Sequence, residues 1–327
     1  MSWSKIVGHE QIKARLKTAL LQQRLAPALI FVGPTGVGKR LCALALAKAV
    51  NCERADGDSC DRCAACRKIA AGTHLDVKMV EPEGAFIKVA QIRQLVEDAN
   101  YKPFEGRRRV FIIDPADAMN ETAANALLKT LEEPPEDSLL ILISDKLHAL
   151  LPTIRSRCQI QLFTPLSTEE VEAFLRRFDA RAEADIQLTA RLAAGCIGRA
   201  LDVDLVVYRE QRKETIELLK LLGASSQRAR LIRAAEYLGK KLSRDEFQKR
   251  LDILYLVLRD LFHLLVEGPT ADVTNIDIAP TLQQLAREWS LTRIEQFTAH
   301  LETLQRNLQQ NVHRQLALEE IFLVSLA

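Results

Sequence analysis

The chain has 327 residues, of which 48% are hydrophobic and 27% are charged. A single hydrophobic core stops growing near ~250 to 300 residues, so this length predicts two or three compact units. The composition, with 13 glycines and 11 prolines, excludes disordered and collagen-like proteins. Lys and Arg number 45 against 43 Asp and Glu, and the net charge of +2 is too small to coat nucleic acid through bulk electrostatics. Any contact with DNA is therefore expected from a local patch or from partner proteins.

The sequence shows no sign of a membrane or export segment. No apolar run approaches the ~18 residues that a membrane-spanning helix needs, since runs such as 139–143 stop after five. Residues 1–17 lack the apolar middle and the small-residue cleavage site of a secretory signal. We therefore expect a cytoplasmic protein without a membrane partner, and in that reducing compartment the seven cysteines are not expected to form a disulfide framework.

Short apolar runs alternate with helical patterns from residue 26 to residue 163. Such bounded runs are typical of buried parallel strands, and the segments between them are long enough for right-handed helical crossovers. The sequence therefore predicts an α/β fold with a five-stranded parallel sheet. The expected strands cover residues 28–32, 75–80, 110–113, 139–143 and 159–163.

A glycine-rich loop follows the first expected strand directly. It carries Gly33, Gly36 and Gly38, then Lys39, and a strongly helix-forming run begins at Leu41. Glycines let backbone N–H groups approach a phosphate, the dipole of the following helix favours negative charge, and the lysine can reach the β- and γ-phosphate oxygens. The segment predicts a nucleotide-binding phosphate loop; the alternative is a tight strand-to-helix turn without a ligand.

The eighth position of this loop departs from the pattern. A Ser or Thr hydroxyl normally holds Mg²⁺ there, but this chain has Arg40. Because a cation cannot ligate a cation, binding of Mg-ATP should be weakened or lost.

Four cysteines follow the helix after the glycine-rich loop. Cys52, Cys60, Cys63 and Cys66 supply four thiolates within 15 residues, and the last three form two overlapping C-x-x-C steps. An all-sulfur set without an obvious open position indicates structural Zn²⁺, and an iron–sulfur cluster or a redox pair is the rival interpretation. The other three cysteines lie in apolar or helical settings and are expected to be packing residues. They are Cys42, Cys158 and Cys196.

A second departure from an active nucleotide site follows the third strand. Asp114 stands where the carboxylate of a Walker B strand holds Mg²⁺ through water, but the next position, where a glutamate would polarise the attacking water, is Pro115. Proline has no side-chain base, so hydrolysis at this site lacks its general base. With Arg40, this predicts a site that does not turn over ATP by itself. The basic stretch 106–109, just before the strand, reads as a solvated turn, with a DNA-backbone contact as the alternative.

After Pro165 the strand pattern disappears. Residues 167–170 have the spacing of a capping box and open one helical run, and a second run covers 185–194 before glycines break it. From about residue 208 the pattern is helical again. A long run covers 243–267, and its apolar residues at helical spacing are expected in a bundle core or a subunit interface.

The C-terminal part ends in further helical runs. We expect Thr292, with Glu295 three residues later, to cap a helix there. Together with the runs before it, this predicts a small helical unit followed by an all-α bundle.

Two segments carry a resemblance to a known family. Residues 125–135 and 151–158, the latter containing Ser-Arg-Cys, resemble the signature of AAA+ clamp-loader ATPases of bacterial DNA polymerase III. The resemblance covers essentially the whole chain and ends with residues 311–319, which are similar to the final collar helix. The chain's size, its degenerate nucleotide site and its cysteine cluster are most similar to the non-motor subunit of these loaders.

The resemblance implies three domains. An AAA+ phosphate-loop domain is expected over 1–165, with the cysteines in a zinc module inserted at about 51–67. A small helical lid domain is expected over 166–207, and an all-α collar domain for oligomerisation over 208–327.

The resemblance also implies roles for single residues. Arg157 matches the arginine finger that reaches into the ATP site of a neighbouring subunit, a task suited to a planar and permanently charged group; the alternative is a surface arginine before a buried strand. Ser144 matches sensor 1, although the family often has Thr or Asn there. Arg199 matches sensor 2, and with an empty local site it is expected to serve in packing or a salt bridge instead. The N-terminal segment 7–9 matches the part beside the adenine.

The function implied is that of a largely ATPase-inactive member of a loader ring. Its expected partners are motor subunits of the gamma/tau type and a delta subunit, and, through the complex, the sliding clamp and primed DNA. The alternative is an active gamma/tau-type motor that binds Mg-ATP despite Arg40 and Pro115. A third possibility is an AAA+ protein of DNA repair that is unrelated to the clamp.

Overall fold

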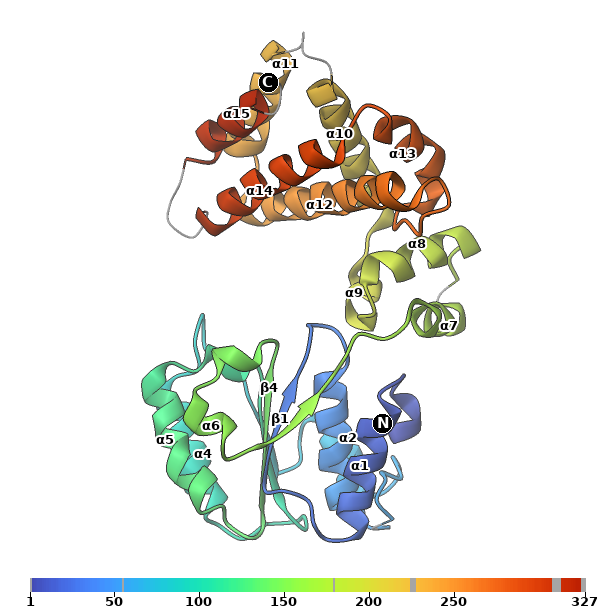
Figure 1. The fold of residues 1–327 in the computed structure, drawn as a ribbon. Helices are drawn as coiled ribbons and strands as arrows, with labels where there is room; N and C mark the ends of the chain where they lie inside the picture. Colours follow the sequence, from blue (N-terminus) through green and yellow to red (C-terminus); the bar gives the residue numbers. More distant parts are fainter. Residues whose placement is uncertain (1, 55, 179, 224–227, 308–312, 325–327) are drawn as a thin grey trace. The chain divides into compact units, whose positions relative to one another are not determined.

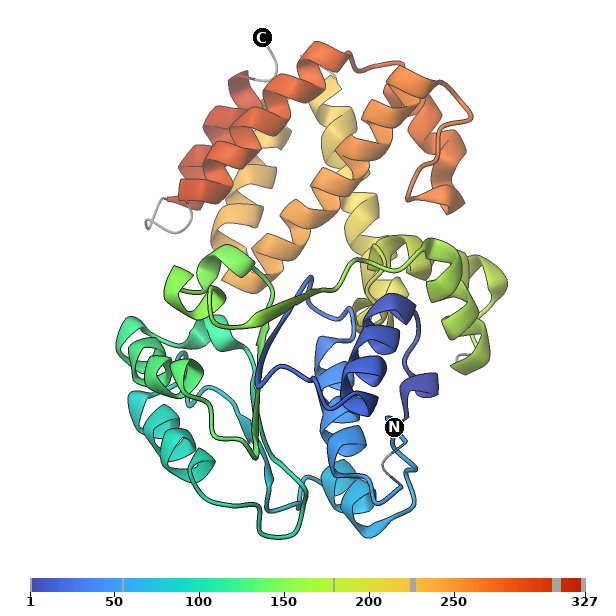
Figure 2. The same cartoon turned by 60° about the horizontal axis from the view of Figure 1, so that its bottom comes forward.

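The computed structural model describes residues 2–54, 56–178, 180–223, 228–307 and 313–324 (Figures 1 and 2). The chain divides into two compact units, which we describe separately. The first comprises residues 1–180 with 193–202, and the second comprises 181–192 with 203–327. Within the described residues, no helix combines the length and the apolar character needed to cross a membrane.

The first unit contains a parallel sheet and the helices that cover it. Its strands are β1 (Ala28–Val32), β2 (Val77–Val80), β3 (Arg109–Ile113), β4 (Ser138–Ser144) and β5 (Gln159–Leu162). Its main helices are α1 (Glu10–Leu21), α2 (Lys39–Asn51), α3 (Ala64–Ala71), α4 (Val89–Ala99), α5 (Glu121–Glu132), α6 (Pro152–Arg155), α7 (Thr168–Phe178) and α9 (Ile197–Asp202). Short 3₁₀ turns lie at Trp3–Lys5, Ala116–Ala118 and Leu147–Ala149.

The five strands form one parallel sheet in the order β2-β3-β4-β1-β5. The predicted α/β class and strand number are therefore confirmed, with every strand within two residues of its predicted start. The largest difference is β2, which starts at Val77; before it, the N–H groups of Leu75 and Asp76 donate to the side chains of Glu105 and His74, at 3.0 and 3.2 Å. Since carboxyl ends of parallel strands share one edge, the segments after β1, β3 and β4 meet there.

Helices cover both faces of this sheet. Helices α1 and α2 pack on one face, where Leu16 and Leu46 lie in the same core as Phe31. Helices α4 and α5 pack on the other face, where Ile92 and Leu127 share a core with the opposite side of the strands (Figure 1). β1 and β4 are buried throughout, which explains why their sequences are continuous apolar runs and not alternating ones.

All regular elements in the described part of the second unit are helices. Its elements are α8 (Glu183–Ala193), α10 (Leu205–Gly223), α11 (Arg228–Glu236), a π-helical turn (Tyr237–Lys241), α12 (Arg244–Glu267), a 3₁₀ turn (Ile276–Ile278), α13 (Ala279–Ala286), α14 (Leu291–Asn307) and α15 (Arg314–Val324). The apolar residues of α12 at helical spacing, including Phe247, Leu254 and Leu261, are buried in one core with α10, α13 and α14. They are core residues of a helical bundle, which is one of the two locations predicted from the sequence, a bundle core or a subunit interface.

Helix caps test the sequence patterns directly. The capping box at α7 is confirmed, because Ser167 N donates to Glu170 Oε2 at 2.9 Å and Glu170 N donates to Ser167 Oγ at 3.2 Å. The cap predicted at Thr292 is wrong: α14 already begins at Leu291, and its cap is Ser290, whose Oγ accepts from Arg293 N at 3.3 Å. Ser and Thr are both favoured N-cap residues, so residue type alone does not exclude Thr292, and the position where the helical backbone begins decides between the two.

The helices of the predicted lid, 166–207, are shared between the two units. The start of α9 contacts the glycine-rich loop, where Gly198 N donates to Gly36 O at 2.8 Å. Most of α8 belongs to the second unit, where Asp185 pairs with Arg209 at 2.6 Å and Arg191 donates to the carbonyl of Val273 at 3.0 Å. The division into domains at 1–165, 166–207 and 208–327 stays a prediction. In the predicted final helix, 311–319, residues 311 and 312 lie outside the described residues, and α15 begins at Arg314.

Candidate nucleotide site and metal centre

The glycine-rich loop has the strand–loop–helix form that the sequence predicted. It links β1 to α2, and Gly33, Gly36 and Gly38 all have positive φ, at 155°, 82° and 111°. A Cβ atom on Gly33 would lie 2.2 Å from the carbonyl oxygen of Phe163, so close approach of the next strand requires glycine there. Gly38 is the N-cap of α2, which directs the N-terminus of that helix at the loop.

The side chain of Lys39 points into the glycine-rich loop, where it would bind a phosphate. It is buried, and its Nζ donates to the carbonyls of Gly33 and Pro34 and forms an ion pair with Asp145 at 2.7 Å. Burial opposes ionisation of Asp145, but hydrogen bonds from Lys39 and Thr35 outweigh it and lower the pKa of that carboxyl. The charge that would bind a phosphate is therefore neutralised within the chain.

Arg40 pairs with the carboxylates on the metal side of the site. Its Nη2 lies 2.6 Å from Glu81 Oε1, and its Nη1 lies 3.6 Å from Asp114 Oδ2. Burial raises the pKa of Asp114, and the charges of Arg40 and Lys39 offset part of that rise. Asp114 follows β3 directly, and the next residue is Pro115. A guanidinium therefore accompanies the carboxylate that the Mg²⁺ role requires, and the position expected for the general base carries no carboxylate.

The other predicted nucleotide residues surround the loop in different ways. Ser144 is fully buried, and its Oγ exchanges hydrogen bonds with the backbone of Lys146. Arg199 is exposed, and its charge helps to lower the pKa of Asp145. His9 Nε2 lies 3.0 Å from the carbonyl oxygen of Val37, so the N-terminal segment does reach the loop.

Arg157 lies between α6 and β5. Its Nη2 atom is 2.7 Å from Glu132 Oε1, and its Nη1 donates to the carbonyl of Thr153 at 2.9 Å. Its side chain is 35% exposed, so the guanidinium is restrained and still accessible. The sequence did not indicate Glu132, whose side chain approaches Arg157 only through the packing of α5 on α6.

The four cysteines of the predicted cluster come together. Their sulfur atoms all lie within 4.8 Å of one another. Backbone N–H groups point at three of them: Cys60 N at Cys52 Sγ (3.4 Å), Cys63 N at Cys60 Sγ (3.2 Å) and Cys66 N at Cys63 Sγ (3.4 Å). Hydrogen bonds from Arg62 and Cys63 lower the pKa of Cys60, whereas burial raises the pKa of Cys66. The donor set fits one metal ion held by four thiolates.

The N-terminal segment anchors the cysteine cluster on one side. Trp3 is buried, and its Nε1 donates to the carbonyl of Gly57 at 2.9 Å. Asp61 forms ion pairs with Lys5 at 3.1 Å and with Lys48 at 3.0 Å. The contacts of Trp3 and Lys5 join residues 54 and 56 positions apart, which no local pattern in the sequence indicates.

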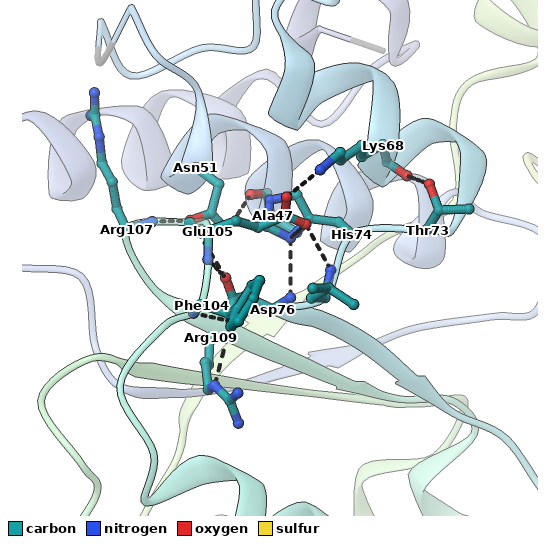
Figure 3. A network of polar contacts seen from close by, with 12 residues as sticks. Ala47, Asn51, Lys68, Thr73, His74, Asp76, Phe104, Glu105, Arg107 and Arg109 are labelled. Atoms are coloured by element: carbon teal, nitrogen blue, oxygen red, sulfur yellow. Dashed lines mark hydrogen bonds and ion pairs between the residues drawn. The ribbon is translucent and has the colours of Figure 1, made fainter.

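A polar network links the loop before β3 to α3 (Figure 3). Asp76 accepts hydrogen bonds from the N–H groups of Phe104, Glu105 and Gly106 at 2.7–2.8 Å. Glu105 in turn pairs with Lys68 of α3, which begins within the cluster. The loop before β3 is therefore tied to the helix that carries Cys66.

The same network corrects the reading of the basic stretch 106–109. Arg109 turns inward and lies 3.4 Å from Asp76, so it is not part of a solvated turn. The N–H groups of Arg107 and Arg108 both donate to Asn51 Oδ1, at 2.7 and 3.0 Å. Of the three arginines, only Arg107 has an exposed side chain.

Comparisons with known proteins show the family of the chain. Residues 8–167 match the family model described as DNA polymerase III, delta subunit, and residues 209–325 match that of DNA polymerase III, delta subunit, C terminal. The chain is 31% identical to the DNA polymerase III subunit delta' of Bacillus subtilis, covering 99% of this chain and 98% of that protein. It is 42% identical to the delta' subunit of Pseudomonas aeruginosa over 60% of this chain and 61% of that protein.

A tau subunit is also similar to the chain, but over a smaller part of both proteins. The chain is 35% identical to the DNA polymerase III subunit tau of Bacillus subtilis, covering 68% of this chain and 41% of that protein. Fold, loop and relatives together define a phosphate-loop protein of the clamp-loader class. Within that class the match over almost the full length favours delta' over gamma/tau, and the chain belongs to the DNA polymerase III delta' family.

Proposed function

We propose that the chain is the stator of a clamp loader: it hydrolyses no ATP at its own loop and supplies Arg157 to the ATPase site of a neighbouring subunit. The ring would open the sliding clamp and place it on primed DNA during replication. The observation that carries this proposal is the internal neutralisation of the nucleotide site, where Lys39 pairs with Asp145 and Arg40 approaches Asp114. Lys39, the cation that a phosphate would need, already has a carboxylate partner in the chain, and Arg40 pairs with Glu81 beside Asp114.

Arg157 supports the second half of the proposal by its chemistry. A guanidinium that reaches a transferring phosphoryl group stabilises the charge that spreads over its oxygens. Arg157 is permanently charged, accessible and held at the edge of the unit between α6 and β5. Its role is to act on a nucleotide bound elsewhere, which makes the chain an interaction protein with one catalytic group in trans.

The partners follow from the same assignment. The relatives of this chain are DNA polymerase III subunits, and we place gamma/tau-type motors and a delta subunit beside it in a ring joined through the second unit. The clamp and DNA would be reached through the complex, in the cytoplasm. We assign Arg199 and Ser144 packing and hydrogen-bonding roles around the glycine-rich loop in place of nucleotide sensing.

We further propose Zn²⁺ for the four cysteines. A set of four thiolates without an open coordination position is typical of structural zinc, and such a site contributes to folding and not to catalysis. Cys52, Cys60, Cys63 and Cys66 would hold the ion. Metal analysis of the purified chain separates zinc from iron.

Two measurements test the stator. The isolated chain is expected to show neither Mg-dependent ATP binding in the micromolar range nor steady ATP turnover; either finding would favour a gamma/tau-type motor. In the complex reconstituted with its loader partners, Arg157→Ala is expected to leave assembly unchanged and to lower ATPase activity, because one site loses its charge-stabilising group. Unchanged ATPase would remove the role of Arg157, and failure to assemble with loader subunits would favour a protein of another pathway.

A further inference from the structure

The guanidinium of Arg157 is held from two sides. Nη2 pairs with Glu132 Oε1 at 2.7 Å, while Nη1 donates to the carbonyl of Thr153 at 2.9 Å and to Oγ of Ser156 at 3.2 Å. A guanidinium has five N–H groups, and these three contacts leave two of them for an approaching anion. The arrangement restrains the plane of the group without occupying it fully.

The groups that hold Arg157 belong to packed helices as well as to the loop that carries the arginine. Glu132 is the last residue of α5, which the following Glu133 and Pro134 terminate. Thr153 lies in α6, and α5 and α6 share the core that contains Leu127 and Ile154. Glu132 and Thr153 therefore hold Arg157 in a position set by the body of the unit.

The location of Glu132 is not explained by helix stability. The C-terminus of a helix carries a partial negative charge, so a carboxylate in the last turn of α5 is unfavourable by itself. Its side chain is half exposed, and the contact that compensates for the placement is the ion pair with Arg157. Lys129, one turn earlier, is the basic residue of that last turn.

We propose that Glu132 is the positioning residue of the arginine finger, an assignment that rests on the role of Arg157 proposed above. The carboxylate fixes one edge of the guanidinium before a neighbouring subunit's nucleotide arrives. The long side chain then loses less conformational freedom on engagement, and its two remaining N–H groups face the nucleotide together. Misplacement of a catalytic group by about 1 Å can cost on the order of 10²-fold in rate, so a restraint of this kind acts on turnover.

The test uses the reconstituted loader complex and compares Glu132→Gln, Arg157→Ala and the double variant. Glu132→Gln keeps the size of the side chain and removes its charge. It is expected to lower the maximal ATPase rate by at least half of the decrease that Arg157→Ala causes, with the KM for ATP unchanged. The double variant is expected to be no slower than Arg157→Ala alone, because Glu132 acts only through the arginine.

Glu133→Gln is the matched control: it changes the neighbouring exposed carboxylate, for which no contact with Arg157 is seen among the described residues. It is expected to leave the ATPase rate unchanged. A normal or raised rate in Glu132→Gln would overturn the positioning role, and so would a further decrease in the double variant. If Arg157→Ala itself has no effect, the finger proposal fails; if it lowers the rate and Glu132→Gln does not, only the positioning role fails.

Discussion

At the scale of single residues, the cations of the glycine-rich loop are paired with carboxylates. The sequence shows that Arg40 replaces a hydroxyl and Pro115 replaces a carboxylate, and both are losses. The structure adds two sets of ion pairs: Lys39 pairs with Asp145, and Arg40 pairs with Glu81 and approaches Asp114. Neither Glu81 nor Asp145 belongs to the loop pattern, so their parts in the site appear only when the ends of β2, β3 and β4 meet.

The Lys39–Asp145 pair predicts a pH-dependent contribution to stability. The pKa of Asp145 is lowered, so the pair stabilises the folded state above the ordinary pKa near ~3.9 and loses this effect as the pH falls through the lower folded value. Asp145→Asn is expected to destabilise the chain by about 1 kcal/mol at pH 7, since the carboxylate is partly exposed. In thermal melting, the difference from the unchanged chain should shrink as the pH is lowered from 5 towards 3.

The same variant tests the closure of the loop. Asp145→Asn leaves Lys39 without its carboxylate, so the isolated chain is expected to bind ATP about tenfold more tightly than before, a change of ~1.4 kcal/mol. Asp137→Asn, at an exposed position outside the loop, is the control and should change neither property. Equal ATP affinity in all three proteins would show that the ion pair does not keep the nucleotide out.

At the scale of elements, apolar runs predicted the limits of strands more accurately than cap spacing predicted the start of a helix. β1, β3 and β4 were predicted within one residue because each is a bounded apolar run, and burial of β1 and β4 on both faces leaves little freedom in their limits. The edge strands β2 and β5 are not buried throughout, unlike the buried strands that the sequence predicted. The cap of α14 was predicted two residues too late, because Thr292 with Glu295 has the same spacing as a true capping box. In the structure both residues lie inside the helix.

This correction gives a test of the second unit. Ser290→Ala removes the hydroxyl that accepts from Arg293 N and is expected to lower the free energy of unfolding by about 1 kcal/mol. Thr292→Ala changes an exposed helical position and should be neutral or slightly stabilising, because alanine has the higher helix propensity. Denaturant unfolding of both variants checks the ranking, and the reverse order would restore the cap to Thr292.

At the scale of the whole molecule, the N-terminal segment connects two distant sites of the first unit. Trp3 and Lys5 contact the cysteine module, and His9 contacts the glycine-rich loop through Val37. The module is also tied to the loop before β3 by Lys68 and Glu105 (Figure 3). A metal in the cluster would therefore order the start of the chain as well as its own ligands.

Removal of the metal is expected to change the environment of Trp3. The chain has two tryptophans, and Trp289→Phe leaves Trp3 as the only one. Because Trp3 is buried against the module, a chelator should shift its fluorescence to longer wavelength and lower the melting temperature. Cys60→Ser should show the shifted emission without chelator, and Cys158→Ser, outside the cluster, should behave like the parent. An unchanged spectrum after complete loss of metal would contradict this coupling.

The sequence by itself determined the parallel sheet, the phosphate loop with its two departures, and the four cysteines, because each depends on a short local pattern whose chemistry is independent of distant residues. Only the tertiary structure decided which carboxylates neutralise Lys39 and Arg40, that Glu132 holds Arg157, and that Arg109 turns inward to Asp76. Such pairs join residues from different elements. Their partners are chosen by how the strands are ordered and the helices packed, which no local spacing records.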